Sequence, residues 1–267
     1  MAGRPSPQSP PDAASRALAW EGCLNVRDLG GHPTEDGGTT AYGAVVRADS
    51  VRRLSAAGWE ALVSYGVERI VDLRFRDELE ADPPAEVPVE VVHVPVLPDP
   101  VSPDWPEISR LADASPDEAS ATATVYLEFL RRYRAGFGAA VSAVATAPPR
   151  AVVVHCMVGK DRTGLVAALL LRLAGVPVEH VAADYALSAA NLAAISEPWV
   201  EEAPDEIERR RRSRMIATPE RAMVTVLEEL GRAGVAIIRL RRRLSASSCA
   251  SSTHGSEITA RLAALSA

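Results

Sequence analysis

The sequence predicts an α/β protein with a single domain, in which a central, mainly parallel sheet is flanked by helices. Short apolar runs that suit buried strands alternate with longer segments of helical periodicity. The strongest apolar run, residues 151–154, leads through a short loop into residues 165–171, which are apolar on all sides and therefore predict a buried helix. A chain of 267 residues with 47% hydrophobic content is long enough to bury the core of one such domain.

The first half of the chain supplies most of the predicted sheet. Residues 1–16 are rich in Pro, Ser and Ala and predict a disordered arm before a domain that spans residues 17–245. Ser55 can cap a helix that ends near Gly66. A charged loop with Glu78 is expected between the second and third strands. The strands themselves are expected at residues 44–47, 69–73 and 91–95.

The second half of the chain is expected to be mostly helical. Residues 98–120 are acidic and Pro-rich and predict a long loop, and a long helix is expected over residues 123–146. Gly175 and Pro177 end the buried helix, and a further helix carries Asp184 and Tyr185. Another helix follows Thr218 and Pro219, and residues 246–267 are expected to form a C-terminal tail.

Residues 155–164, which read His-Cys-Met-Val-Gly-Lys-Asp-Arg-Thr-Gly, join the strand to the buried helix. The backbone N–H groups of a loop at a helix N-terminus can turn inward and form a nest for an anion such as phosphate. The same field favours the thiolate form of Cys156, which is then a nucleophile at neutral pH. Arg162 offers a planar fork that matches two phosphoryl oxygens. The predicted phosphate-binding residues are Met157, Val158, Gly159, Lys160 and Arg162.

Other side chains of the loop suit the remaining steps of phosphate ester hydrolysis. Asp161 is close enough in sequence to protonate the departing ester oxygen and later to activate water, although Asp is also a good helix-capping residue and that structural role stays an alternative. Thr163 can hydrogen-bond the thiolate and help it leave. His155 is assigned a structural role beside the cysteine. This chemistry needs no metal or cofactor, and no His or Cys elsewhere shows ligand spacing.

Two features outside the core of the loop allow two interpretations each. Asp72, at the end of its strand, either points at the same cleft as Cys156 and assists there, or forms an ion pair with Arg74. The arginine run at residues 209–214 follows several glutamates, which favours solvated ion pairs, while contact with an anionic lipid surface is the alternative. Lys160 is the only lysine of the chain, and we expect its ammonium at the rim of the site, where it can meet a second phosphate.

The block from His155 to Gly164 resembles the signature loop of the cysteine-dependent protein tyrosine phosphatases, in the form found in a bacterial family related to the dual-specificity group. Three more segments, Asn25–Gly31, Val71–Arg74 and the pair Asp184 and Tyr185, are similar to motifs of that family. The resemblance implies a protein tyrosine phosphatase-like fold, a nucleophile at Cys156, a phosphate-binding arginine at Arg162 and a loop-borne acid at Asp161. Lys160 is also similar to a lysine in the signature loops of lipid phosphatases.

The expected function is hydrolysis of phosphotyrosine on proteins through a phosphocysteine intermediate, with phosphoserine and phosphothreonine as further substrates. A phosphoinositide phosphatase is the alternative, and a non-catalytic phosphopeptide-binding module is disfavoured because nucleophile, arginine, acid and hydroxyl are all present. The net charge of −6 argues against a nucleic-acid partner. No run of about 18 uncharged apolar residues and no signal-peptide core is present. A cytoplasmic location and, from the many arginines and the single lysine, an actinobacterial source are expected.

Overall fold

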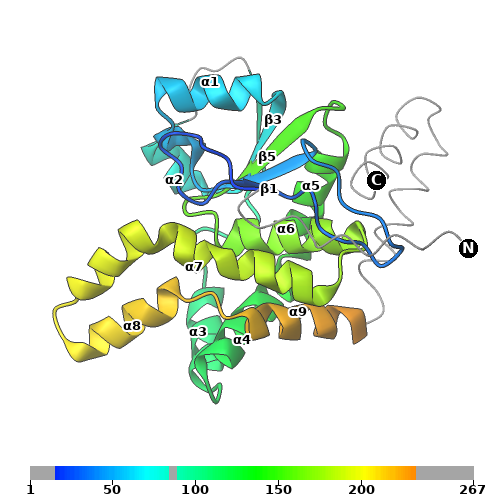
Figure 1. The fold of residues 1–267 in the computed structure, drawn as a ribbon. Helices are drawn as coiled ribbons and strands as arrows, with labels where there is room; N and C mark the ends of the chain where they lie inside the picture. Colours follow the sequence, from blue (N-terminus) through cyan, green and yellow to red (C-terminus); the bar gives the residue numbers. More distant parts are fainter. Residues whose placement is uncertain (1–15, 84–88, 233–267) are drawn as a thin grey trace, which may run out of the picture.

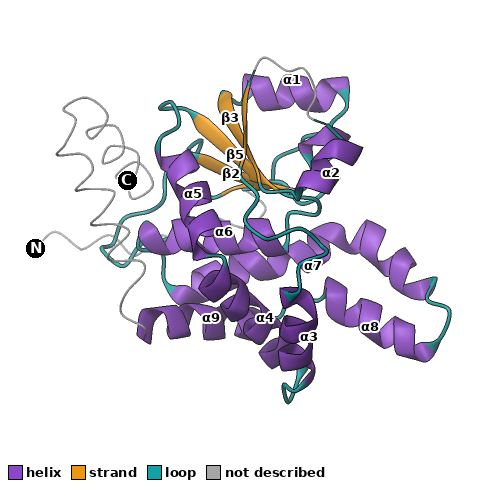
Figure 2. Cartoon of the chain, turned by 180° about the vertical axis from the view of Figure 1, so that it is seen from behind, coloured by secondary structure: helices purple, strands orange, loops and turns teal. Residues whose placement is uncertain are grey.

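The structure is a computed structural model that describes residues 16–83 and 89–232. Five strands of the described chain form one sheet in the order β1-β2-β5-β3-β4. β1 (Arg27–Asp28) is antiparallel to β2 (Val45–Ala48). The other pairings, which join β2, β5 (Ala151–His155), β3 (Val67–Asp72) and β4 (Glu90–His93), are parallel. The predicted sheet, mainly parallel and flanked by helices, is therefore confirmed (Figure 2).

The central strand β5 is buried on both faces because its side chains alternate between two cores. Val152 and Val154 belong to the larger core, which most of the helices build. Ala151 and Val153 belong to a smaller core on the opposite face. There the sheet is covered by the N-terminal segment around Trp20 and by α1 (Ala56–Ser64), which Figure 1 shows on the far side of the sheet from the long helices. Ser55 caps α1 by accepting from the Gly58 N–H, as predicted.

The larger core is built around α6 (Asp161–Leu173), which follows β5 directly and is buried along most of its length. α7 (Val178–Glu201) packs against α6, and α9 (Glu220–Arg232) and α4 (Glu118–Arg132) contribute further buried residues to the same core. α9 packs against both α4 and α7. In contrast, α8 (Glu206–Ile216) has no buried residue and packs against α7 (Figure 1).

The prediction of a charged loop after β3 is wrong, because the chain forms a short helix there, α2 (Arg76–Ala81). The carboxylate of Glu78 accepts a hydrogen bond of 2.7 Å from the Phe75 N–H and so satisfies a backbone group at the start of the helix. Asp77 adds a second negative charge in the first turn, where the helix dipole favours it.

The expected long loop over residues 98–120 is also wrong. It contains α3 (Asp104–Asp113) and the beginning of α4. Asp104 and Glu107 lie in the first turn of α3, which the helix dipole favours, and Ile108 is buried against the larger core. The acidic composition that resembled a loop therefore belongs to the exposed side of an amphipathic helix.

The single long helix expected over residues 123–146 is divided at Tyr133 into α4 and α5 (Arg134–Ala145). Tyr133 departs from helical geometry, with φ −111° and ψ 26°. Gly136, in the first turn of α5, lies so close to the chain after β4 that a Cβ would stand 3.0 Å from the Cα of Val96. The break lets α5 approach the sheet more closely than a continuous helix would.

The expected N-terminal arm needs a correction at its last residue. Arg16 is buried and its guanidinium contacts Asp184 at 2.7 Å, so the ordered chain includes it. The rest of that arm, and the expected tail at residues 246–267, lie outside the described residues. None of the helices in the described ranges combines the length and the apolar character that crossing a membrane requires.

Candidate active site

The parallel strands bring the predicted loop and two other strand ends to one edge of the sheet. His155, the last residue of β5, pairs with Ala48 of β2 on one side and with Asp72 of β3 on the other. Cys156 therefore leaves the sheet between the segments that follow β2 and β3. Ligands of open α/β sheets bind at this edge, beyond the carboxyl ends of the strands.

Three backbone carbonyls of the loop accept hydrogen bonds from residues outside the loop. The Ser50 N–H donates to the Met157 oxygen at 3.1 Å, and the amide of Asn25 donates to the Val158 oxygen, also at 3.1 Å. The guanidinium of Arg47 donates to the Gly159 oxygen at 2.8 Å. A loop whose carbonyls are fixed in this way presents its N–H groups to its interior, which is the arrangement of an anion nest.

Gly159 is required at its position by two independent constraints. Its φ is +67°, in the left-handed region that other residues rarely adopt. A Cβ there would also stand 2.5 Å from the carbonyl oxygen of Ala48. The loop therefore packs directly on the end of β2 without room for a side chain.

The predicted nucleophile Cys156 is 1% exposed, at the base of this loop. The hydrogen bond that we expected from Thr163 to its sulfur is not formed in the structure. Instead, the Thr163 hydroxyl is buried and lacks a hydrogen-bond partner among the described residues. A buried hydroxyl without a partner is unfavourable, so Thr163 is free to bond a group that enters the site.

Arg162 lies in the first turn of α6 and is fixed by two side chains of the segment after β3. The carboxylate of Glu78 accepts from both terminal nitrogens of its guanidinium, at 2.5 and 2.9 Å. The ring of Phe75 lies beneath the same group, with 4.3 Å between the guanidinium carbon and the ring centroid. Partial burial acts to raise the pKa of Glu78, but the hydrogen bonds and charge of Arg162 outweigh it and hold that pKa below its ordinary value.

Asp161 precedes Arg162 and keeps a partly exposed side chain. Its Oδ1 accepts a hydrogen bond of 2.5 Å from the hydroxyl of Tyr126, which comes from α4. The ammonium of Lys160 lies 3.5 Å from the same oxygen. The sequence analysis gave Tyr126 no role in the site, and it treated Glu78 only as part of a charged loop.

Lys160 does not stand at the rim of the site as we expected. Its side chain is 8% exposed, and its ammonium donates to the carbonyl oxygens of Met215 and, at 3.3 Å, Ala217. These carbonyls belong to the C-terminal end of α8 and the residue after it, where helical carbonyls lack intrahelical partners. The lysine thus ties the loop to the connection between α8 and α9.

His155 and Asp72 form a buried polar cluster behind the loop. The Asp72 carboxylate receives three hydrogen bonds of 2.8 to 3.1 Å from the Arg74 guanidinium, and His155 Nε2 lies 3.6 Å from it. Burial acts to raise the pKa of Asp72, yet His155 and Arg74 hold it below the ordinary value, while burial lowers the pKa of His155. Of the two interpretations of Asp72, the structure shows the ion pair with Arg74, and assistance at the cleft stays a prediction.

Asp184 of α7 holds together the scaffold around the loop. Its buried carboxylate contacts the guanidinium groups of Arg16, Arg27 and Arg47 at 2.7 to 3.0 Å. Burial acts to raise its pKa, but the arginines and His32 hold it well below the ordinary value. Because Arg47 also binds the Gly159 carbonyl, α7 and the loop share one ionic network.

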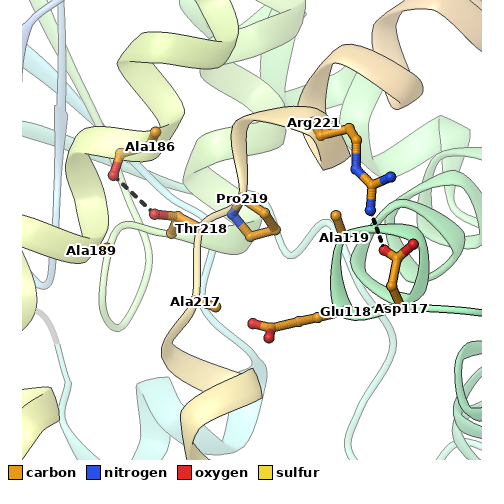
Figure 3. Close-up of a pocket in the computed structure, with 9 residues that line it drawn as sticks. All are labelled: Asp117, Glu118, Ala119, Ala186, Ala189, Ala217, Thr218, Pro219 and Arg221. Carbon is orange, nitrogen blue, oxygen red and sulfur yellow. Dashed lines mark hydrogen bonds and ion pairs between the residues drawn. The ribbon is translucent and has the colours of Figure 1, made fainter.

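A surface pocket of about 590 Å³ lies next to the residues that receive Lys160. Four alanines line part of the pocket, Ala119, Ala186, Ala189 and Ala217. Its polar groups come from Asp117, Glu118, Thr218 and Arg221. Figure 3 shows the ion pair between Asp117 and Arg221 at one side and the hydrogen bond from Thr218 to the Ala186 carbonyl at the other.

The described residues contain no cluster of His, Cys, Asp or Glu suited to a metal ion.

The arginine run on α8 forms the solvated ion pairs that its spacing favoured. Glu206 pairs with Arg209 and Arg210, at 3.1 and 3.0 Å. Glu208 pairs with Arg211 and Arg212, both at 3.0 Å. Four of the arginines that could meet a lipid surface are therefore already engaged within the helix, where they share two carboxylates.

Comparison with known proteins finds relatives among the tyrosine phosphatases. The profile described as the tyrosine phosphatase family matches residues 18–234. A tyrosine-protein phosphatase of Nostoc commune is 32% identical over 150 residues, which cover 55% of this chain and 48% of that protein. The triple specificity protein phosphatase PtpB of Mycobacterium tuberculosis is 30% identical over 186 residues, covering 61% of this chain and 66% of that protein. The chain thus spans about half to two thirds of the length of these relatives.

Among solved structures, TpbA of P. aeruginosa is 20% identical, with a TM-score of 0.30. The match covers 75% of this chain and 86% of that protein.

Proposed function

This chain belongs to the tyrosine phosphatase family, and we propose that it is a cysteine-dependent phosphatase that hydrolyses phosphotyrosine on proteins. Phosphoserine and phosphothreonine are further substrates in this proposal. One observation carries the proposal. Cys156 lies at the base of a loop whose carbonyls are bound from outside by Ser50, Asn25 and Arg47. Such a loop can hold a phosphate dianion directly over the sulfur of the cysteine.

The reaction proceeds in two displacements. The Cys156 thiolate attacks phosphorus, an S–P bond forms, and the bond from phosphorus to the ester oxygen breaks while Asp161 gives that oxygen a proton. The Asp161 carboxylate then takes a proton from water as the water attacks phosphorus. The S–P bond breaks, inorganic phosphate leaves, and the thiolate is restored.

Charge stabilisation comes from the loop and from Arg162. Glu78 occupies the edge of the guanidinium formed by Nη1 and Nη2, which leaves the edge that includes Nε for two phosphoryl oxygens. The same arginine and the inward N–H groups oppose the charge that spreads over the oxygens during transfer. The unpartnered Thr163 hydroxyl supports a role in bonding the sulfur when it becomes the leaving group.

Protein substrates are placed ahead of phosphoinositides for a structural reason. A lipid headgroup with several phosphates was expected to meet Lys160 and the arginines of α8. Lys160 is instead occupied by two backbone carbonyls, and Arg209 to Arg212 are paired with glutamates. The name of the PtpB relative, which reads triple specificity, supports testing more than one class of phosphate ester.

The test replaces Cys156 by serine and uses Cys23→Ser as the matched control. Cys23 is the other described thiol, and burial raises its pKa well above the ordinary value, so it is a poor nucleophile. With p-nitrophenyl phosphate and a phosphotyrosine peptide, Cys156→Ser is expected to lose more than about a thousandfold of kcat and to keep binding the ester, because the loop and Arg162 remain. Cys23→Ser should retain activity. Retention of a tenth of the activity by Cys156→Ser would contradict the proposal.

A parallel measurement ranks the substrates. Turnover of a phosphotyrosine peptide, a phosphoserine peptide and an inositol phospholipid is compared under one set of conditions. We expect the tyrosine peptide to give the highest kcat/KM. A higher value for the phospholipid would reverse the order of the two candidate functions.

A further inference from the structure

Two tyrosines from different helices form a short chain of hydrogen bonds that ends at Asp161, the proposed acid. The hydroxyl of Tyr126, on α4, donates to Asp161 Oδ1 at 2.5 Å. The hydroxyl of Tyr185, on α7, lies 2.9 Å from that of Tyr126. Both side chains are almost completely buried, and their rings meet edge to face with 5.9 Å between centroids. Neither hydroxyl can therefore turn away to a different partner in the solvent.

The direction of this short chain of hydrogen bonds is fixed by counting protons. A hydroxyl has one proton to donate, and an ionised carboxylate can only accept. Tyr126 uses its proton on Asp161, so Tyr185 must be the donor in the bond between the two tyrosines. Burial raises the pKa of Tyr126 and of Tyr185 well above the ordinary value, with the Asp161 charge adding to it, so both remain protonated donors across the neutral range.

The two oxygens of Asp161 are therefore unequal. Oδ1 receives the Tyr126 hydroxyl and lies 3.5 Å from the Lys160 ammonium. Arg162, the neighbouring residue, carries a positive charge that also interacts with the carboxyl group. No described residue forms a hydrogen bond with Oδ2, and the side chain is 40% exposed. A proton added to Oδ2 leaves the bonds at Oδ1 in place.

We propose that Tyr126 and Tyr185 are positioning residues, which hold Oδ1 of Asp161 so that Oδ2 is the oxygen that delivers and recovers the proton. This rests on the acid and base role proposed above for Asp161.

The test variant is Tyr126→Phe, which deletes only the hydroxyl. Its matched control is Tyr133→Phe, because the Tyr133 hydroxyl makes a similar bond of 2.6 Å to Asp104, at the end of the same helix and outside the site. Without this donor, Oδ1 of Asp161 is no longer held, and Oδ2 is less often aligned with the ester oxygen. Turnover of phenyl phosphate should fall about tenfold and that of p-nitrophenyl phosphate much less, because only the poorer leaving group depends on an aligned proton donor.

Tyr185→Phe provides a graded second variant, which keeps the bond from Tyr126 to Asp161 and should change the leaving-group dependence in the same direction by a smaller amount. If Tyr126→Phe does not fold, as judged by thermal melting, Tyr185→Phe decides the question. If the variant that folds shows the same leaving-group dependence as Tyr133→Phe, this inference is overturned. In that case, loss of turnover in Cys156→Ser still supports the proposed function. A wild-type protein without phosphatase activity overturns both.

Discussion

The carboxylate of Glu78 accepts hydrogen bonds of 2.5 and 2.9 Å from both terminal nitrogens of the Arg162 guanidinium, although the two residues are 84 positions apart. The Phe75 ring lies beneath the same guanidinium. The arginine is thus held at one edge and along one face, which leaves the Nε edge to bind an oxyanion. Fixing the fork before substrate arrives reduces the ordering needed on binding, and this favours transition-state stabilisation.

Glu78→Gln should therefore lower kcat/KM about tenfold, because an amide offers only one acceptor to the guanidinium in place of two charged oxygens. Glu78→Ala should be more severely impaired. Glu80→Gln is the matched control, since Glu80 is exposed on the same short helix. Steady-state kinetics with p-nitrophenyl phosphate measures the effect. Equal values of kcat/KM for Glu78→Gln and Glu80→Gln would show that Arg162 needs no such support.

The same pair predicts how stability depends on pH. The pKa of Glu78 is held below its ordinary value of 4.5 by Arg162, against the opposing effect of partial burial. The pair therefore contributes stability that is fully present above pH 4.5 and is lost as pH falls through the lower pKa of the folded state. Melting temperatures of wild type and Glu78→Gln should differ most near neutral pH and converge as pH falls through the lowered pKa of the folded state. A difference that grows on acidification would contradict this sign.

The reactive loop could be predicted from sequence because all its chemistry is local. Cys156 and Arg162 lie in one contiguous segment between a strand and a helix, and the strand fixes where the segment emerges. Glu78 could not be found in this way, because its role depends on α2, which was read as a loop. The signal that was available is the spacing of Phe75 and Glu78, since a glutamate three residues after a helix start commonly bonds back to the backbone.

Residues that act across the fold were the hardest to predict. Asp184 was singled out by resemblance alone, and nothing in its helix shows that three arginines from the N-terminal region converge on it. Tyr126 looks like any other aromatic residue on an apolar helix face. Its role depends on the position of α4 relative to α6, which local periodicity does not determine.

Asp184→Asn is expected to destabilise the protein by about 3–5 kcal/mol, because it leaves Arg16, Arg27 and Arg47 buried without their common countercharge. Asp113→Asn, at the exposed end of α3, is the control and should change stability by less than about 0.5 kcal/mol. Urea unfolding measures both. A change below about 1 kcal/mol for Asp184→Asn would mean that the arginines find other partners or water.

Gly159→Ala should disrupt the loop. The added Cβ meets the Ala48 carbonyl at 2.5 Å, and the backbone must keep a φ of +67°. We expect a loss of about 2 kcal/mol or more in stability, and loss of most activity because the anion nest is displaced. Gly138→Ala is the matched control: its Cβ meets nothing within 4 Å inside α5, so it should be neutral or slightly stabilising. Full activity in Gly159→Ala would contradict the packing of the loop on β2.

Lys160→Met tests whether the only lysine of the chain recognises a second phosphate. In the structure its ammonium is bound to the carbonyls of Met215 and Ala217, so its first effect is to fasten the loop to the connection after α8. Removing the charge should therefore weaken all phosphate esters alike, by roughly three- to tenfold in kcat/KM, through loss of one buried anchor and one nearby positive charge. Arg210→Met, on the exposed face of α8, is the control and should leave every substrate unaffected. Values of kcat/KM for a phosphotyrosine peptide and an inositol phospholipid are compared in both variants. A loss at least ten times larger for the phospholipid would show that Lys160 leaves its carbonyl partners to bind a second phosphate, and would restore the lipid substrate as the leading candidate.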